Sequence, residues 1–331
     1  MTPRQRPGRA KRPKGLQTML SGNGHPEYMR LLDALALARV HRLELAARGA
    51  VEGFVTGRHR SPSKGFSTEF AEHRQYVPGD DAADIDWRVY GRSDRYYVKQ
   101  YVEETNLRAT ILVDCSGSMS YTGSAAARRD GKALSKFEYA QYLAASLAHL
   151  MLHQQDAVGL VTFDSRVRRY IPARNRGGHM RVILQELAGA RCGAETRLAA
   201  VFHDIAERIH RRGLVAIISD LLDDPEAVLA ALHHFRYRRH EVIVMHVMAE
   251  EELTLPFDGF CDFRDLEAGG RRVRLDPRAA RAEYLNQLGR HVERLKTGCG
   301  RMSIDYVLFS TRHSFDEALA RFLAERMARV K

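Results

Sequence analysis

The chain has 331 residues, of which 44% are hydrophobic and 28% charged, and its formal net charge is +11. This composition is typical of one large globular domain or two modest ones, each able to bury a core. It excludes a bilayer-spanning helix, because no apolar stretch approaches the roughly 20 residues that such a helix needs.

The first 25 residues are rich in Pro, Gly and basic residues. Residues 1–14 hold six basic and no acidic residues, and they lack the apolar core of a secretory signal. We therefore expect a disordered basic tail over 1–25 and a cytoplasmic protein. Such a tail is usually solvated, but contact with nucleic acid or an acidic partner is the alternative. The rest of the chain is only mildly basic, so nucleic acid is not the favoured partner.

Four cysteines, at positions 115, 192, 261 and 299, lie far apart in the chain and form no C-x-x-C pair. In a reducing compartment this spacing predicts free thiols that are buried or nearly so. A zinc site built on cysteines is not expected.

Residues 26–106 are expected to form a helix followed by a strand-rich segment. Leucines at helical spacing predict a helix over about 26–50, which ends near Gly49. Residues 53–106 contain turn signals at SPSKG and VPGDD and no long helical period, which favours short strands and loops. We expect Trp87 and several tyrosines to form a small core for this segment.

Residues 107–331 alternate apolar runs with helical patterns. The runs RATILV, DAVGLVTF, LVAIIS, HEVIVMHV and SIDYVLFS are continuous, as in parallel strands covered on both faces. VRRYIPA alternates and is predicted to be an antiparallel edge strand. Helices are predicted after Ser135, from Leu198, and over 225–237, 277–296 and 315–330.

The predicted fold class follows from this alternation. Strands separated by helices of this length indicate an α/β domain over 107–331 with a doubly wound, mostly parallel open sheet. One insertion interrupts the pattern near 257–275, where a β-hairpin is predicted to turn at Gly269-Gly270.

Polar side chains stand at the carboxyl ends of several predicted strands. The stretch ILVDCSGSMS places Asp114, Ser116 and Ser118 at alternate positions after a buried strand, so their side chains point the same way. Thr196 stands just before the helix predicted from Leu198, and Asp220 is the last residue of LVAIISD. If the first and third strands are neighbours, all of these groups meet at one sheet edge, where such folds bind ligands.

This set of oxygens is suited to Mg²⁺ (or Mn²⁺), since it offers no sulfur or imidazole and few charges. Water must complete a six-ligand shell, and the neutral hydroxyls leave the ion electrophilic. We therefore predict a metal site formed by Asp114, Ser116, Ser118, Thr196 and Asp220. Such a site could recruit a carboxylate of another molecule, whereas a simple polar turn is the bland alternative.

The arrangement resembles the von Willebrand factor type A fold and its metal-ion-dependent adhesion site. The Asp-x-Ser-x-Ser element of that family matches Asp114, Ser116 and Ser118, and its later Thr and Asp match Thr196 and Asp220. The resemblance implies a doubly wound sheet that binds Mg²⁺ and docks proteins.

Two positions depart from the family pattern. Glu195 precedes Thr196 where a small residue is usual, so an extra negative charge is expected near the site. Leu221 follows Asp220 where many members carry glycine. Neither change removes a ligand, and Thr196 is the assignment that depends most on the resemblance.

The segment from GRHRSPSKGF to YVEETN, residues 57–106, resembles the region that precedes the A-type domain in a bacterial family known as domain of unknown function fifty-eight. The resemblance covers about residues 26–330. It implies a partner, a MoxR-type AAA+ ATPase or its client, and a role in ATPase-assisted maturation or metal insertion. The expected function is a metal-dependent protein–protein interaction module, with the strand-rich segment packed beside the sheet to widen the docking surface.

Enzymatic activity is not expected, and no catalytic residue is assigned. A phosphatase of the haloacid dehalogenase type needs a second aspartate where this chain has Ser116. A serine hydrolase needs a histidine base and a G-x-S-x-G elbow, which C-S-G-S does not supply. A metal-assisted hydrolase is therefore a weaker alternative than nucleic-acid binding through the tail. The acidic residues Asp80, Asp81, Asp84 and Asp86 lack calcium-loop spacing and are interpreted as a solvated turn.

Overall fold

The computed structural model describes residue 31 and residues 68–77, 85–103, 107–129, 131–193, 197–267 and 272–330. The predicted basic tail and nearly all of the predicted helix over 26–50 lie outside these ranges. Thr196 and Glu195, the tip of the predicted hairpin, and Asp80, Asp81 and Asp84 of the acidic cluster also lie outside them.

Residues 68–77 and 85–103 form a small strand-rich unit. Strands β1 (Thr68–Gln75) and β2 (Tyr97–Glu103) pair antiparallel. Between them lies a short helix that was not predicted, α3 (Trp87–Ser93). Asp86 caps α3, because its carboxylate accepts hydrogen bonds from the backbone N–H groups of Arg88 and Val89 at 2.9 and 3.3 Å. Its role is therefore structural.

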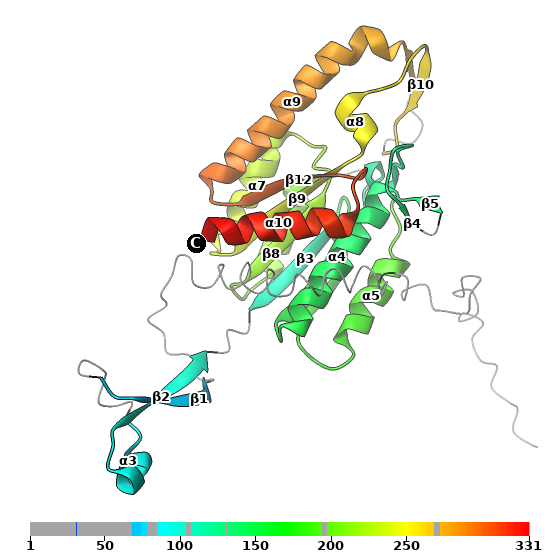
Figure 1. Cartoon of the computed structure of the whole chain (residues 1–331). Helices are drawn as coiled ribbons and strands as arrows, with labels where there is room; N and C mark the ends of the chain where they lie inside the picture. Colours follow the sequence, from blue (N-terminus) through cyan, green and yellow to red (C-terminus); the bar gives the residue numbers. More distant parts are fainter. Residues whose placement is uncertain are drawn as a thin grey trace, which may run out of the picture.

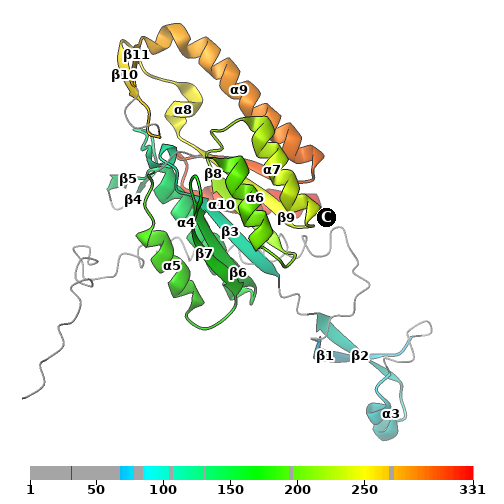
Figure 2. The ribbon, with the colours of Figure 1, turned by 180° about the vertical axis from the view of Figure 1, so that it is seen from behind.

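The aromatic side chains of this unit only partly form the expected core. Tyr90 stacks on Tyr96 with ring centroids 4.6 Å apart, and Tyr76 lies 6.3 Å from Tyr96. Trp87, however, is 60% exposed. Figures 1 and 2 place β1, β2 and α3 beyond the amino end of the sheet, which corrects the expectation that this unit packs beside it.

The main domain is built on one six-stranded sheet with the strand order β12-β9-β8-β3-β6-β7. Five strands are parallel, and only β7 runs antiparallel, at the edge. The strands are β3 (Arg108–Asp114), β6 (Ala157–Phe163), β7 (Val167–Arg174), β8 (Leu214–Ser219), β9 (Glu241–Met248) and β12 (Asp305–Ser310). Every residue of β6 and β8 is buried, which explains their continuous apolar sequence.

Helices cover both faces of this sheet (Figures 1 and 2). The apolar cluster on one face includes α4 (Lys136–His153), α5 (His179–Gly189) and α10 (Phe315–Val330). The cluster on the other face includes α6 (Leu198–Arg208), α7 (Pro225–Tyr237) and α9 (Pro277–Arg301). The structure thus confirms the predicted α/β class, a doubly wound and mostly parallel open sheet.

Local sequence signals explain which helices were predicted. Helix α4 begins with a complete capping box, in which Ser135 Oγ accepts from the Glu138 N–H at 3.1 Å and the Glu138 carboxylate accepts from the Ser135 N–H at 2.9 Å. Helix α5 follows Gly178, which has a φ of 80° and offers no side-chain cap. That missing signal is why α5 was not predicted.

Shorter elements cluster around the carboxyl end of the sheet. They are the 3₁₀ turn η3 (Ser118–Ser120), strands β4 (Arg128–Arg129) and β5 (Lys132–Ala133), and helix α8 (Glu250–Thr254). The predicted hairpin is confirmed by β10 (Cys261–Arg264) and β11 (Arg272–Leu275), which pair antiparallel. All four cysteines are free thiols.

Candidate functional site

The candidate site lies where strands β3 and β8 end side by side. These strands pair parallel, with Val113 opposite Ile218, so the condition for convergence is met. Ser219 at the end of β8 donates its Oγ–H to Asp114 Oδ2 at 2.6 Å, which joins the two strand ends directly. Asp114 and Asp220 are both buried, at 0% and 1% exposure.

The loop after β3 folds its hydroxyls toward these carboxylates. The Ser116 N–H donates to Asp114 Oδ1 at 2.8 Å, which turns the chain sharply after the strand. Ser116 Oγ lies 3.1 Å from Ser118 Oγ, and the Ser118 side chain interacts with the carboxylate of Asp220 and helps to lower its pKa. The structure therefore brings together four of the five predicted ligands. Thr196 lies outside the described residues, so its assignment stays a prediction.

A buried lysine, which the sequence analysis missed, also belongs to this site. Lys136 is the first residue of α4, and its side chain is 0% exposed. Its Nζ atom donates to Asp220 Oδ2 at 2.8 Å and to Glu252 Oε1 of helix α8 at 2.6 Å. The capping-box sequence gives no sign that this lysine is buried, because the residue after the N-cap of a helix is ordinarily exposed.

The charges of the site strongly influence one another. Burial, together with the negative charge of Asp220, raises the pKa of Asp114 to about 7. Burial alone would also raise the pKa of Asp220, but the Lys136 ammonium holds it below its usual value. Lys136 in turn has a raised pKa, because the two carboxylates outweigh its burial.

The donor set fits a hard divalent cation. Two carboxylates and two hydroxyls converge, and oxygen ligands of this kind suit Mg²⁺ better than softer metals. Within the described ranges, no group of three or more His, Cys, Asp and Glu side chains is placed to hold a metal. A cation here would therefore depend on the serine hydroxyls and on water.

The chain following Asp220 has an unusual backbone. Leu221 has a φ of 50°, in the left-handed region that glycine adopts most easily. The Leu221 side chain is fully buried, and the carbonyl of Leu221 accepts a hydrogen bond from His291 Nε2 of α9 at 3.1 Å.

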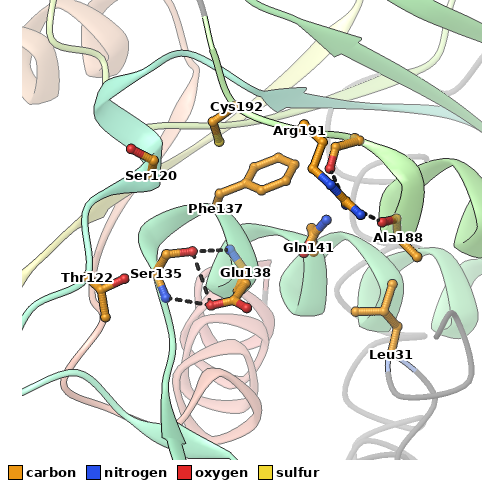
Figure 3. A pocket seen from close by; sticks show the side chains of 11 residues that line it. Leu31, Ser120, Thr122, Ser135, Phe137, Glu138, Gln141, Ala188, Arg191 and Cys192 are labelled. Carbon is orange, nitrogen blue, oxygen red and sulfur yellow. Dashed lines mark hydrogen bonds between the residues drawn. The ribbon is translucent and has the colours of Figure 1, made fainter. Parts of the chain in front are cut away.

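A pocket of about 510 Å³ adjoins the loop after β3 (Figure 3). Ser120 and Thr122 of that loop line one side, and residues around the start of α4, at the end of α5 and in the chain after it line most of the rest. The remaining lining residues are Leu31, Ser135, Phe137, Glu138, Gln141, Ala188, Ala190, Arg191 and Cys192. Arg191 donates to the carbonyls of Ala188 and Ala190 at 2.7 and 3.0 Å, so its guanidinium is partly satisfied by the wall itself.

Comparison with known proteins places the chain in a family. Residues 72–294 match the family described as "Protein of unknown function DUF58", so the chain belongs to it. An uncharacterized protein of Mycobacterium tuberculosis, Rv1480, is 27% identical over 306 residues, which cover 89% of this chain and 90% of the relative. The predicted family is confirmed.

Solved structures with a similar chain path include BatB of Bacteroides thetaiotaomicron (17% identical, TM-score 0.42, covering 67% of this chain and 99% of that one). An aerotolerance-related membrane protein of Bacteroides fragilis is 16% identical, with a TM-score of 0.41 and coverage of 67% and 99%. The SpRpn10 VWA domain is 12% identical, with a TM-score of 0.36 and coverage of 67% and 95%.

These comparisons correct the predicted cytoplasmic location. The Bacteroides fragilis protein is described as a membrane protein, so the cytoplasmic assignment was wrong and is not carried into the proposed function. In the part of the chain that the structure describes, no helix is both long and apolar enough to cross a bilayer.

Proposed function

We propose that this protein is a protein-interaction module whose docking site depends on a divalent cation. The residues that would hold the cation are Asp114, Ser116, Ser118 and Asp220, with Thr196 as the fifth predicted ligand. When bound, Mg²⁺ (or Mn²⁺) would supply a Lewis-acidic position for a carboxylate of the partner. The observation that carries the proposal is the convergence of two carboxylates and two hydroxyls at the ends of neighbouring strands.

The residues around the site suit a protein partner rather than a small substrate. Leu222, two residues after Asp220, is 43% exposed, and Leu266 of the hairpin is 45% exposed. The hairpin also presents exposed Arg264 and Arg274. An exposed mixture of leucine and arginine side chains is typical of protein interfaces, in which arginine pairs with acidic groups.

We further propose that the partner is a MoxR-type AAA+ ATPase or its client, and that the protein acts as an adaptor in protein maturation. This part of the proposal is supported by the family resemblance. We assign no catalytic residue, because no histidine of the described ranges is a hydrogen-bond partner of Ser116 or Ser118.

Calorimetry with Mg²⁺ on the full chain tests the cation site. Asp114→Asn keeps the shape of the side chain but removes its charge, and it is expected to lose Mg²⁺ binding by at least about tenfold, since a charge-assisted contact contributes about 1.5–3 kcal/mol. Asp156→Asn is the matched control, because Asp156 is also a buried aspartate, 3% exposed, but it lies just before β6 at the opposite end of the sheet.

Equal Mg²⁺ binding by the wild type and Asp114→Asn would refute the cation site. The partner is tested by co-purification with the MoxR-type ATPase, with and without a chelator. A complex that survives the chelator and Asp114→Asn but is lost on deletion of residues 1–25 would favour the basic tail as the binding element instead.

A further inference from the structure

Lys136 is the most unusual charged residue of the described chain. Its ammonium group is fully buried and bridges two carboxylates, Asp220 Oδ2 at 2.8 Å and Glu252 Oε1 at 2.6 Å. Asp220 is itself a predicted metal ligand. The positive charge of the lysine is therefore hydrogen bonded to the carboxylate that a divalent cation would need.

Placing a lysine here is costly in two ways. An ammonium group loses its favourable hydration when it leaves water, unless partners replace that hydration. Lys136 also stands at the first position of an 18-residue helix, where the helix dipole disfavours positive charge. The two carboxylates must offset both terms. A lysine at this position is thus best explained by its interaction with Asp220 and Glu252.

The two carboxylates are held differently. Asp220 follows the end of β8 and interacts with Ser118 of the loop after β3. Glu252 belongs to α8, where its Oε2 atom accepts from the Ala249 N–H at 2.8 Å and its carbonyl accepts from Tyr284 Oη of α9 at 2.8 Å. Glu252 is therefore fixed independently of the candidate metal site, and it can keep Lys136 when Asp220 turns away.

We infer that Lys136 is an internal competitor for the divalent cation, and that Glu252 is the partner that retains Lys136 when Asp220 is released to the cation. This inference rests on the proposed function. Without a divalent cation, the lysine compensates the charge of Asp220 and keeps the strand end folded. With a cation, Asp220 exchanges the lysine for the ion. Lys136 thereby sets the cation concentration at which the docking site becomes competent.

The test is calorimetric titration of the full chain with Mg²⁺ alone, comparing the wild type with Lys136→Met/Glu252→Gln. This double variant removes one positive and one negative charge, so the net charge of the site is unchanged and only the competition is lost. Met fills a volume similar to that of Lys, and Gln can still accept from the Ala249 N–H. Mg²⁺ binding is expected to tighten roughly tenfold to a hundredfold, because the competing charged hydrogen bond has been removed.

Thermal unfolding is a second measurement, and it distinguishes competition for the cation from a purely structural role of Lys136. The double variant leaves buried Asp220 unpaired, so without Mg²⁺ its Tm is expected to fall below that of the wild type. With saturating Mg²⁺ the two Tm values are expected to approach each other. Equal losses of Tm with and without Mg²⁺ would overturn the inference.

The remote control is Arg208→Met/Asp204→Asn, which removes an exposed ion pair of α6 joined at 2.9 Å and is expected to leave Mg²⁺ affinity unchanged. Equal or weaker Mg²⁺ binding by the Lys136→Met/Glu252→Gln protein would overturn the inference but leave the proposed function standing. No Mg²⁺ binding by either protein would overturn both.

Glu252→Gln alone, which keeps the lysine on Asp220, is a second variant if the double variant does not fold. It is expected to bind Mg²⁺ several-fold more weakly than the wild type, and tighter or equal binding would refute the inference.

Discussion

The carbonyl group of Leu266, just after strand β10, occupies the space in which a side chain at Gly117 would begin. A Cβ atom built on Gly117 collides with the Leu266 carbonyl oxygen and lies 2.9 Å from its carbonyl carbon. Gly117 has φ −60° and ψ −40°, which any residue can adopt. The glycine is therefore required by the close approach of the hairpin and not by its own backbone conformation.

Gly117→Ala is expected to push the hairpin away from the loop after β3. An added methyl group with no space costs about 1–3 kcal/mol, and the cheapest relief is movement of residues 261–267. Amide hydrogen exchange in β10 should accelerate several-fold. Gly189→Ala is the control, since nothing lies within 4 Å of a Cβ atom at Gly189. Unchanged exchange in β10 of Gly117→Ala would contradict the close contact.

Leu221→Gly is expected to destabilise the protein even though glycine suits the local backbone. Relief of the left-handed conformation at φ 50° would contribute about 1–2 kcal/mol. Loss of the fully buried leucine side chain would cost about 2–5 kcal/mol. The packing term is the larger, so urea unfolding should show a net loss of about 1–3 kcal/mol. Leu222→Ala, at a 43% exposed position, is the control, and a more stable Leu221→Gly protein would refute this balance.

Asp156 gives the stability of the domain a predictable pH dependence. The side chain is 3% exposed, and burial raises its pKa to about 7. Its Oδ1 atom accepts from the Leu107 N–H at 3.1 Å, while Oδ2 has no partner among the described residues. Between the unfolded pKa of 3.8 and about 7, the folded state binds the proton more tightly. The contribution of Asp156 to the free energy of unfolding therefore falls as pH rises through this window.

Asp156→Asn is expected to remove that dependence, because asparagine can accept from Leu107 but does not ionise. Urea unfolding at pH 5 and pH 8 measures the free energy of unfolding of the wild type and of the variant. Taking the difference between the two proteins cancels the contributions of other titrating groups. The variant should gain stability relative to the wild type as pH rises. If the free energy of unfolding changed equally in both proteins between the two pH values, the pKa of Asp156 would not be raised by folding.

The four thiols are expected to react at very different rates. Burial raises the pKa of Cys192 and Cys299 to about 12 and that of Cys115 still higher, and the thiolate is the reactive form. Cys261 lies half-buried on the hairpin. Iodoacetamide at pH 8 should therefore modify Cys261 first, as mass spectrometry of the peptides can show. Cys261→Ser is the control, and equally fast modification of Cys299 would contradict its burial.

The sheet could be predicted because its strands carry local signals. Continuous apolar runs such as LVAIIS identify buried parallel strands, and alternation in VRRYIPA identifies the antiparallel edge. Helix α5 and helix α3 lack comparable signals. Gly178 provides no side-chain cap for α5, and α3 is only seven residues long and has no buried residue.

The part of the candidate site that could be predicted consists of the ligands that lie next to strand ends in the sequence. Asp114 ends β3, Ser116 and Ser118 follow it, and Asp220 follows β8, so strand order alone brings them together. Lys136 was not predictable, because its capture by Asp220 and Glu252 joins segments 84 and 116 residues apart. No local pattern distinguishes it from an ordinary exposed lysine at a helix start.

Helix α9 is connected to the site by a chain of hydrogen bonds that passes through Ser219. Ser219 Oγ donates to Asp114 and accepts from the Leu221 N–H at 3.0 Å, and the Leu221 carbonyl holds His291 of α9. With 25 residues, α9 is about 37 Å long, and its first turn follows directly from the hairpin strand β11. The hairpin is therefore connected to the end of β3 by two routes: the close contact of Gly117 with Leu266, and the hydrogen bonds that lead from Asp114 to α9.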